Sequence, residues 1–364
     1  MNLLFFIETG SGNGRSIADE AIAIQKTRAL NICTASSGKD QENGVLESIE
    51  LSGIDNLELE GMDEHKNFFA HSKALRKYVK EKKFDIIHVQ TNWELILTWY
   101  AILGLKNKPK MIYTIHSFRN NRAFLIRNTV RVAISFILIL FADKVITCSR
   151  FMYESFRILK YKSTILPLGV DNRYIERPFK KVEGPMKIVF PGKFRIGKGQ
   201  DMLIKGFAQY VQESGDKNSL VYLPGDGELI ESCKRLTDTY GVQEQIIFPG
   251  KLSKENLLEL FDQCNIVACT SRSETFSQVL AEGYCLGKCI VTRPVGIAKD
   301  IVDNGKNGFI VEDAEQLKEV FHTLSQQGTK IIEMGKNNYD GRMRFSWNNI
   351  MDGYISICKS LIKA

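Results

Sequence analysis

The sequence lacks several features that would each assign it to a class of protein. Its eight cysteines include no Cys-x-x-Cys pair and no Cys/His cluster at zinc spacing, which argues against a structural zinc site. Its start, MNLLFFIETGSG, has no basic segment and too short an apolar run for a secretory signal, so we interpret it as a first strand. We therefore expect a reduced, cytoplasmic protein without a structural metal.

Histidine, proline and long hydrophobic runs are also scarce. The chain has 5 His and 8 Pro, and its composition of 44% hydrophobic and 25% charged residues is that of a globular protein. The apolar run 132–142 contains 11 residues, and a membrane-spanning helix needs about 20. A chain of 364 residues exceeds what one hydrophobic core usually supports, so two domains are expected.

Charge is distributed unevenly along the chain. The net charge is +7, but residues 1–65 carry 4 basic and 12 acidic side chains, whereas residues 66–170 carry 19 basic and 5 acidic ones. The remaining residues carry 26 basic and 25 acidic side chains. One third of the chain is thus a concentrated basic zone.

Short apolar runs alternate with helical patterns in two series. Such alternation predicts an α/β fold of parallel sheets covered by helices. The expected strands lie in residues 2–7, 29–35, 85–90, 110–116 and 143–149, then 186–192, 219–225, 245–250, 265–271 and 288–292.

A polar segment divides the two series. Residues 171–185 contain two Pro and no periodicity, which favours a linker and predicts domains over 1–174 and 175–345. Ser346 is a plausible N-cap for a final helix, 346–364, which could pack back on the first domain.

A glycine-rich loop in the second domain contains three cations. VFPGKFRIGKGQ leads from a strand into a helix expected near Gln200, and its loop carries Lys193, Arg195 and Lys198. Cations at the end of a parallel strand favour phosphate binding, although a solvated basic turn would have the same pattern.

Two carboxylates occur eight positions apart in TSRSETFSQVLAEG, residues 270–283. Glu274 precedes a helix expected to begin at 275–277, and Glu282 lies two turns inside it. The positive end of the helix dipole favours an anion, Glu274 could accept hydrogen bonds from sugar hydroxyls, and Glu282 from a ribose. The alternative is that neither residue binds a ligand: Glu274 would only complement the helix dipole, and Glu282 would be an ordinary surface residue.

This pair resembles the E-x7-E signature of the retaining glycosyltransferases of family 4. The resemblance extends, in order, through ILPLGVD, PGDGELI, FPGKLSKENLLELFDQCNIVACTS and DNGKNGFIVED, and covers nearly the whole second domain. It implies the GT-B fold, in which two Rossmann-like parallel-sheet domains face each other across a cleft. The first domain would bind the acceptor and the second the nucleotide sugar.

The resemblance also implies roles for individual residues. Glu274 would bind the donor sugar, Glu282 the ribose, and Lys198 a phosphate. The pyrophosphate would meet the amides of Phe276, Ser277 and Gln278. Where the family usually has Arg after the Gly, this chain has Lys193, and either Lys193 or Arg195 would take that role. PVGIAKD differs from the family's Gly-Gly-x-Pro-Glu segment at Val295, Ala298 and Lys299.

Two features of the first domain fit the same resemblance. Gly10, Gly12 and Gly14 are spaced unlike a dinucleotide-binding fingerprint and resemble the family's N-terminal loop on the acceptor side. His116 ends a strand and matches a catalytic His placed near sugar and acceptor. His88 is expected in the core, and Gln90 stands where relatives often have another His.

The implied reaction is transfer of a hexose from a nucleotide diphosphate sugar, with UDP favoured over GDP. The acceptor would be a hydroxyl of a glycan or lipid-linked molecule in cell-surface polysaccharide or glycolipid synthesis. Because no Asp-x-Asp motif occurs, neither metal nor cofactor is expected, and fixed cations would meet the charge of the leaving diphosphate. A UDP-sugar epimerase or hydrolase on the same fold, and a non-catalytic partner subunit, are the alternatives.

The basic zone allows a peripheral membrane contact. Residues 117–143 combine four Arg with the apolar run 132–142, a pattern that fits either docking on an anionic inner membrane face or a core helix flanked by solvated arginines. Nucleic acid is not expected as a partner, because aromatic side chains do not interleave with the cations.

Overall fold

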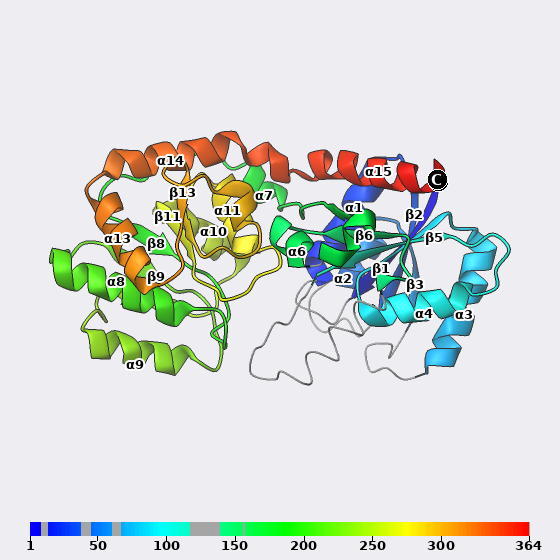
Figure 1. The fold of residues 1–364 in the computed structure, drawn as a ribbon, viewed down its shortest axis with the longest axis horizontal. Coiled ribbons are helices and arrows are strands. Elements are labelled where there is room, and N and C mark those ends of the chain that lie inside the picture. Colours follow the sequence, from blue (N-terminus) through cyan, green and yellow to red (C-terminus); the bar gives the residue numbers. More distant parts are fainter. Residues whose placement is uncertain (9–13, 38–44, 60–66, 117–138, 156, 364) are drawn as a thin grey trace. The chain divides into compact units, whose positions relative to one another are not determined.

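The computed structural model divides the chain into two compact units. One comprises Met1–Gly169 and Trp347–Ala364, the other Val170–Ser346. The structure describes residues 1–8, 14–37, 45–59, 67–116, 139–155 and 157–363. Figure 1 labels the elements, and each unit is described by itself.

The first unit contains a parallel sheet of seven strands in the order β3-β2-β1-β4-β5-β6-β7. Its strands are β1 (Asn2–Glu8), β2 (Asn31–Ser37), β3 (Asp55–Leu59), β4 (Ile86–Val89), β5 (Lys110–Ile115), β6 (Lys144–Thr147) and β7 (Ser163–Ile165). Its described helices are α1 (Gly14–Lys26), α2 (Val45–Leu51), α3 (Phe68–Lys82), α4 (Asn92–Ile102), α6 (Arg150–Ser155), η2 (Arg157–Lys162) and α15 (Trp347–Lys363).

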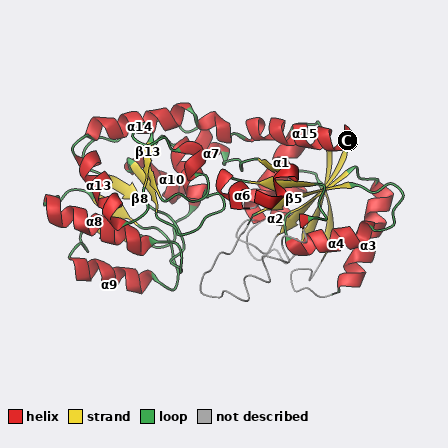
Figure 2. Ribbon diagram, in the orientation of Figure 1, coloured by secondary structure: helices red, strands yellow, loops and turns green. Residues whose placement is uncertain are grey.

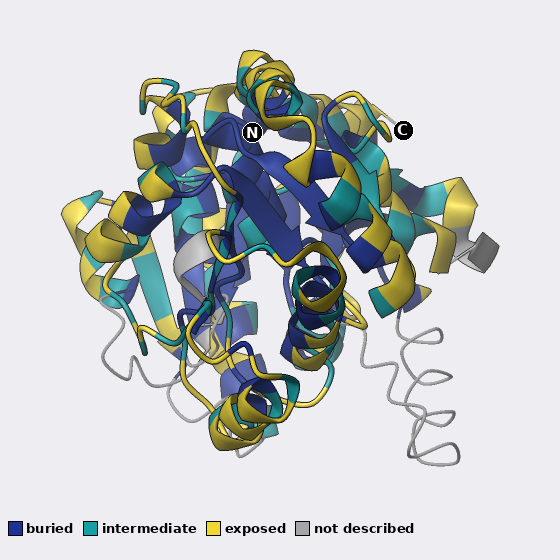
Figure 3. Cartoon of the chain, turned by 90° about the vertical axis from the view of Figure 1, so that its left-hand side faces the viewer, coloured by how far each residue is buried: buried dark blue, intermediate teal, exposed yellow. Residues whose placement is uncertain are grey.

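Hydrophobic runs place these strands in the interior. The central strand β1 is apolar from Leu3 to Ile7, and all five of those side chains are fully buried, as expected for a strand covered on both faces. Figure 3 shows the strands buried and the outward helix faces exposed.

The last helix belongs to the core of the first unit. α15 contributes Ile350, Tyr354 and Leu361 to the same hydrophobic cluster as β1 and α1. The Tyr354 hydroxyl lies 2.9 Å from Nδ1 of His88, whose ring is fully buried. The expectation that His88 is a core residue is therefore confirmed, and α15 packs on the first unit.

The second unit contains a parallel sheet of six strands in the order β10-β9-β8-β11-β12-β13. The strands are β8 (Lys187–Val189), β9 (Leu220–Tyr222), β10 (Ile246–Ile247), β11 (Ile266–Cys269), β12 (Cys289–Thr292) and β13 (Gly308–Ile310). The helices are α7 (Asn172–Ile175), α8 (Gln200–Ser214), α9 (Ile230–Tyr240), α10 (Lys254–Gln263), α11 (Gln278–Cys285), α12 (Ala298–Ile301), α13 (Ala314–Ser325), α14 (Gly328–Asp340) and η3 (Arg342–Phe345). Figure 2 shows helices around the strands in each unit.

The division between the units falls between Gly169 and Val170, so the second unit begins one residue before the segment interpreted as a linker. That segment includes the short helix α7, which is anchored in the second unit. The Tyr174 ring packs edge-on against Phe261, with centroids 6.3 Å apart. Arg342 donates a hydrogen bond to the carbonyl of Ile175. These contacts explain why residues 170–174 group with the second unit.

A buried lysine without a partner predicts a stabilising substitution. Lys288 is 1% exposed, and its Nζ has no hydrogen-bond partner among the described residues. Burial lowers its pKa from the usual 10.5 to about 8. Because the unfolded chain holds this proton more tightly, the group costs the fold about 3 kcal/mol below pH 8. Lys288→Met should therefore raise the free energy of unfolding at pH 7, and the gain should disappear above about pH 10.5.

Urea denaturation at pH 7 and pH 10.5 measures this effect. Lys180→Met is the matched control, because Lys180 lies 3.7 Å from Asp262 in the same charged cluster but is mostly exposed. The control should change stability by less than about 1 kcal/mol. A Lys288→Met variant that is no more stable than the wild type at pH 7 would contradict the account.

Candidate active site

The second sheet has a topological switch point between β8 and β11. The chain runs from β8 outward to β9 and β10, and then returns to the other side of β8 as β11. In open parallel sheets, ligands bind beside the carboxyl ends of the two strands at such a point. The loops that follow these strands contain Lys193, Arg195 and Lys198 on one side and Glu274 on the other.

Lys198 and Glu274 meet directly across the switch point. Lys198 Nζ donates to Oε1 of Glu274 at 2.7 Å, and the two side chains are 21% and 18% exposed. They lie 76 positions apart in the sequence, so only the fold brings them together. The pair is a charge cluster that water reaches only in part.

Backbone contacts hold the two loops together. The hydroxyl of Thr270 donates to the carbonyl of Gly199 at 2.7 Å, and that of Ser271 to the carbonyl of Lys198 at 3.1 Å. The amide of Arg272 donates to the carbonyl of Gly197 at 2.7 Å. Gly199 has a φ of +79°, and a Cβ there would lie 2.0 Å from the carbonyl oxygen of Thr270. Glycine is therefore required at this position.

Helix α11 begins beside this pair with its first amides unpaired. No hydrogen bond from the amides of Phe276, Ser277 or Gln278 is present in the described part of the chain. Ser277, the N-cap, has a φ of +72°, an unfavourable value for a residue with a side chain. Strain of this kind is characteristic of functional sites. The arrangement leaves several backbone donors at the positive end of a helix dipole, where an anion binds well.

The loop after β12 is hydrogen-bonded to the segment in which α11 begins. The amides of Gly296 and Ile297 donate to the carbonyls of Glu274 and Phe276 at 3.1 and 2.9 Å. Val295 and Ala298, two of the positions that differ from the family pattern, are buried. Lys299, the third, is exposed on α12.

Glu282 lies one turn beyond Gln278 and is half-buried. The pKa of its carboxyl is raised from 4.5 to about 8, mainly by desolvation and also by nearby Asp171, while Lys254 and a hydrogen bond from Gln278 oppose the shift. Glu282 lies close enough to Tyr174 of α7 that its charge raises the pKa of the Tyr174 hydroxyl. The carboxyl is thus mostly protonated at neutral pH in the ligand-free protein.

The two other predicted cations face solvent. Lys193 and Arg195 are exposed, and neither side chain makes an ion pair within the described ranges. The backbone of this loop is fixed, since the amide of Phe194 donates to the carbonyl of Asp226 at 2.7 Å and Phe194 itself is fully buried. The loop therefore presents exposed cationic side chains on a fixed backbone.

The candidate residues of the first unit form a separate group. His116 follows β5, and its Nε2 lies 2.6 Å from Oε1 of Gln90, which follows β4. Burial lowers the pKa of His116 to about 4, so the imidazole is neutral at pH 7. Gly14 is the first residue of α1. Gly10 and Gly12 lie outside the described residues, as do residues 117–138 of the predicted membrane contact.

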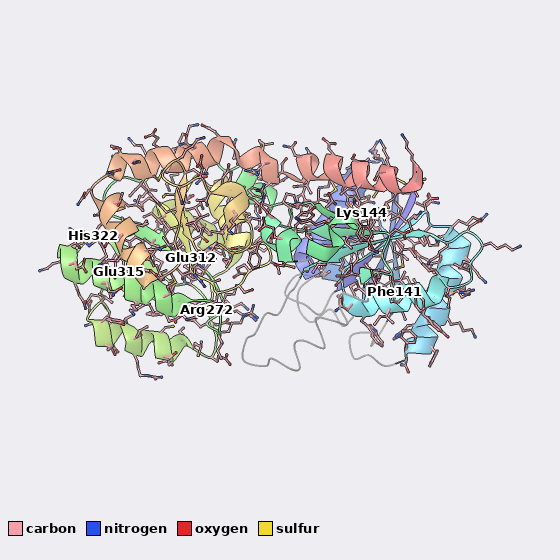
Figure 4. The ribbon with its side chains drawn as sticks, in the orientation of Figure 1. Phe141, Lys144, Arg272, Glu312, Glu315 and His322 are labelled. Carbon is pink, nitrogen blue, oxygen red and sulfur yellow. The ribbon has the colours of Figure 1, made fainter. Side chains whose placement is uncertain are left out.

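Several supporting residues were not identified from the sequence. Thr270 and Ser271 carry the contacts between the loops, and Arg272 forms a two-fold ion pair with Asp201 in the first turn of α8, with closest atoms 2.5 Å apart. Figure 4 shows Arg272 beside the end of that helix. The sequence did contain an indication of these contacts. Hydroxyl side chains follow β11 directly, and such side chains can donate hydrogen bonds to the backbone of a neighbouring loop.

The described residues contain no group of three or more His, Cys, Asp or Glu side chains placed to hold a metal ion. Among the described helices, none has both the length and the hydrophobicity that crossing a bilayer requires. None of the eight cysteines forms a disulfide within the described residues.

Comparison with known proteins identifies the class to which this architecture belongs. Residues 171–340 match the family model for glycosyl transferases group 1, and residues 30–174 match the model for Glycosyltransferase Family 4. The crystal structure of Anabaena Alr3699/HepE in complex with UDP superposes with a TM-score of 0.79 and 18% identity, covering 99% of this chain and 100% of that one. The fold is therefore that of the GT-B glycosyltransferases, and the chain belongs to the family 4-like glycosyltransferases of group 1.

Two proteins with similar sequences are also glycosyltransferases by name. An uncharacterized glycosyltransferase, MJ1069, of Methanocaldococcus jannaschii is 26% identical over 58% of this chain and 52% of its own length. The D-inositol 3-phosphate glycosyltransferase of Corynebacterium aurimucosum is 26% identical over 49% of this chain and 44% of its own length. In each case the match spans about half of the relative.

Proposed function

We propose that this chain is a retaining hexosyltransferase that uses a nucleotide diphosphate sugar, with UDP favoured and GDP next. The observation that carries the proposal is the Lys198–Glu274 pair beside the unpaired amides of α11, at the switch point of the second sheet. The cation and the backbone donors suit the phosphate groups of such a donor. The carboxylate suits the hydroxyls of its sugar. Alr3699/HepE, which shares the fold, has been crystallised with UDP and with UDP-glucose.

The Lys198–Glu274 contact suggests how the site receives its donor. Without ligand, the two half-buried charges neutralise each other, which reduces the cost of keeping either of them out of water. When the diphosphate binds, its oxygens take Glu274's place beside Lys198. The carboxylate of Glu274 is then released to accept hydrogen bonds from hydroxyls of the sugar. Donor binding thus exchanges one ion pair for another.

Breaking the glycosyl–phosphate bond leaves additional negative charge on the departing diphosphate. Lys198 and the amides of Phe276, Ser277 and Gln278 are fixed before the reaction and would stabilise that charge without reorganising. Lys193 or Arg195 adds a further cation from the exposed loop. With these groups in place, we propose that neither a metal nor a cofactor is needed, so activity should survive EDTA.

Retention of configuration requires the acceptor to attack from the face that the diphosphate leaves. We propose that a leaving phosphate oxygen takes the proton of the acceptor hydroxyl on that face. His116, which is neutral at pH 7, contacts the sugar or the acceptor. Glu274 as a covalent nucleophile is the second mechanism, and trapping of a glycosyl-enzyme would favour it.

The nature of the reaction can be tested by product analysis. UDP-glucose labelled in the sugar is incubated with the protein and a panel of glycan and lipid-linked acceptors. The proposal predicts labelled product only in the presence of an acceptor, with the anomeric configuration of the donor. An epimerised nucleotide sugar or free sugar without acceptor would instead identify an epimerase or hydrolase, and binding without turnover a partner subunit.

The raised pKa of Glu282 predicts pH-dependent donor binding. A ribose donates two hydroxyl protons, so it binds the carboxylate better than the protonated acid. Affinity for UDP-glucose should therefore rise by up to about tenfold per pH unit below pH 8 and level off above it. Isothermal titration calorimetry between pH 6 and pH 9 measures the profile.

The diphosphate of the nucleotide sugar does not titrate in this range, and Glu282→Gln provides the control for any titration of the base. The variant should bind with an affinity that does not change with pH. Equal wild-type affinity at pH 6 and pH 9 would show that Glu282 does not carry the ribose.

The acceptor belongs, we propose, to cell-surface polysaccharide or glycolipid synthesis, on the cytoplasmic side of a membrane. The basis is the basic zone at 66–170 and the cationic and apolar segment 117–143. We expect the protein to float with vesicles containing anionic lipid and not with neutral vesicles. Absence of binding to both kinds of vesicle would exclude the peripheral contact.

A further inference from the structure

Gln90 occupies the switch point of the first sheet. The chain leaves β1 toward β2 and β3 and returns beside β1 as β4, and Gln90 is the first residue after β4. Its backbone is held in place by α4. Oε2 of Glu94 accepts hydrogen bonds from the amides of Gln90 at 2.7 Å and Thr91 at 3.0 Å. The side chain of Gln90 therefore projects from a fixed position at the carboxyl end of the sheet.

The side chain of Gln90 determines which nitrogen of His116 carries the proton. The amide oxygen Oε1 has no proton and lies 2.6 Å from Nε2 of His116, so Nε2 must donate. Because burial keeps this imidazole neutral, only one ring nitrogen is protonated, and the lone pair lies on Nδ1. The hydrogen bond thus fixes both the tautomer and the orientation of the ring.

The other end of the Gln90 amide is unsatisfied. The residue is 3% exposed, and Nε2 has no hydrogen-bond partner among the described residues. A buried donor without a partner costs about 1–3 kcal/mol. Such a group is expected where a ligand oxygen completes the arrangement.

Three titratable groups on the described strands and helix beside His116 have partners of their own. His88 on β4 is held by the hydroxyls of Tyr354 and Thr114 and is itself kept neutral by burial. Glu94 on α4 is engaged by the backbone amides, and Tyr113 on β5 donates to Asn92. The side chain of Gln90 contacts the imidazole of His116 directly.

We propose that Gln90 is a positioning residue that holds His116 in its Nε2-protonated form and donates its own free N–H to an oxygen of the acceptor or transferred sugar. The proposal rests on the proposed function only for the identity of that oxygen. Glutamine suits the role because its amide oxygen can accept from His116 while its N–H groups donate to the ligand oxygen. The amide does not titrate. A histidine at this position would exchange protons with its surroundings near neutral pH.

Nitrogen-15 NMR of the histidine-labelled full chain tests the first half without any substrate. His116 is assigned by comparison with His116→Gln, and its nitrogen shifts are followed from pH 4 to pH 9. We expect Nε2 protonated and Nδ1 unprotonated in the wild type. In Gln90→Glu, the added carboxylate should raise the pKa of His116 by about 1–3 units. In Gln90→Met, the tautomers should mix while the pKa stays low.

Gln25→Glu, a substitution on α1 in the same unit, is the matched control and should leave His116 unchanged. A wild-type Nδ1-protonated tautomer, or a His116 pKa that is unaffected by Gln90→Glu, would overturn the proposal. A purely structural role for Gln90 would change stability and leave the tautomer as it is.

Kinetics test the second half. In Gln90→Met, loss of the donor to the ligand oxygen should lower kcat/KM about tenfold or more. In Gln90→Glu, the acid limb of the kcat/KM profile should move to higher pH together with the pKa of His116. Unchanged kcat/KM in Gln90→Met would overturn the contact to the ligand. If the wild type transfers no sugar, the proposed function fails, while the NMR result still decides the role of Gln90 toward His116.

Discussion

Lys198→Ala should lower turnover by about 10²–10³-fold, equivalent to roughly 2.7–4 kcal/mol of transition-state stabilisation. The substitution removes the cation that donates to Glu274, and with it the charge that we propose meets the leaving diphosphate. The fold should remain intact, with some loss of stability from the unpaired Glu274, because Thr270 and Ser271 still hold the two loops together. Steady-state rates with UDP-glucose and the melting temperature measure the two effects separately.

Lys205→Ala is the matched control for this substitution. Lys205 lies on the same helix, α8, and its side chain is exposed, so its removal should change neither turnover nor melting temperature. Adding Glu274→Gln to Lys198→Ala should not restore the rate, because in the proposed mechanism Lys198 acts on the diphosphate and not only on Glu274. Near-full turnover of Lys198→Ala would refute the assignment of this lysine.

Gly199→Ala should destabilise the second unit by about 2–5 kcal/mol. The new Cβ would lie 2.0 Å from the carbonyl oxygen of Thr270 and 2.6 Å from its carbon, both backbone atoms that cannot rotate away. The left-handed backbone at φ +79° adds further strain. To relieve the clash, the loop carrying Lys198 must move away from the loop carrying Glu274, so donor affinity should fall as well. Urea denaturation and calorimetry with UDP measure both effects.

Gly215→Ala separates the clash from the backbone strain. Gly215 ends the same helix with φ +69°, and a Cβ there would meet nothing within 4 Å. We expect this variant to lose only about 1–2 kcal/mol and to bind UDP normally. Equal stability losses in the two variants would mean that the loops do not depend on close approach at Gly199.

The architecture followed from hydrophobic periodicity wherever the strands lay in apolar runs. All ten expected strands are present, and every sheet is parallel. Three strands, β3, β7 and β13, were not predicted. β13 is only three residues long and begins with Gly308, so its sequence resembled a loop; it pairs because β12 offers a free edge. Short strands of this kind are determined by the neighbouring strand more than by their own side chains.

The site was predictable to the level of individual loops but not of contacts. Sequence spacing placed Lys198 and Glu274 at strand ends, and α11 begins within a few residues of the expected position. The ion pair between them depends on the order of strands in the sheet, which the spacing does not contain. The raised pKa of Glu282 likewise depends on burial and on Asp171 and Lys254, which come from other segments. Long-range electrostatics of this kind requires the folded structure.

A crystal structure of the full chain grown with UDP tests the central claim most directly. We expect the diphosphate on the first amides of α11 with Lys198 turned toward it, and the ribose hydroxyls on the carboxylate of Glu282. A nucleotide bound at any other place on the second unit, with Lys198 still paired to Glu274, would contradict the account.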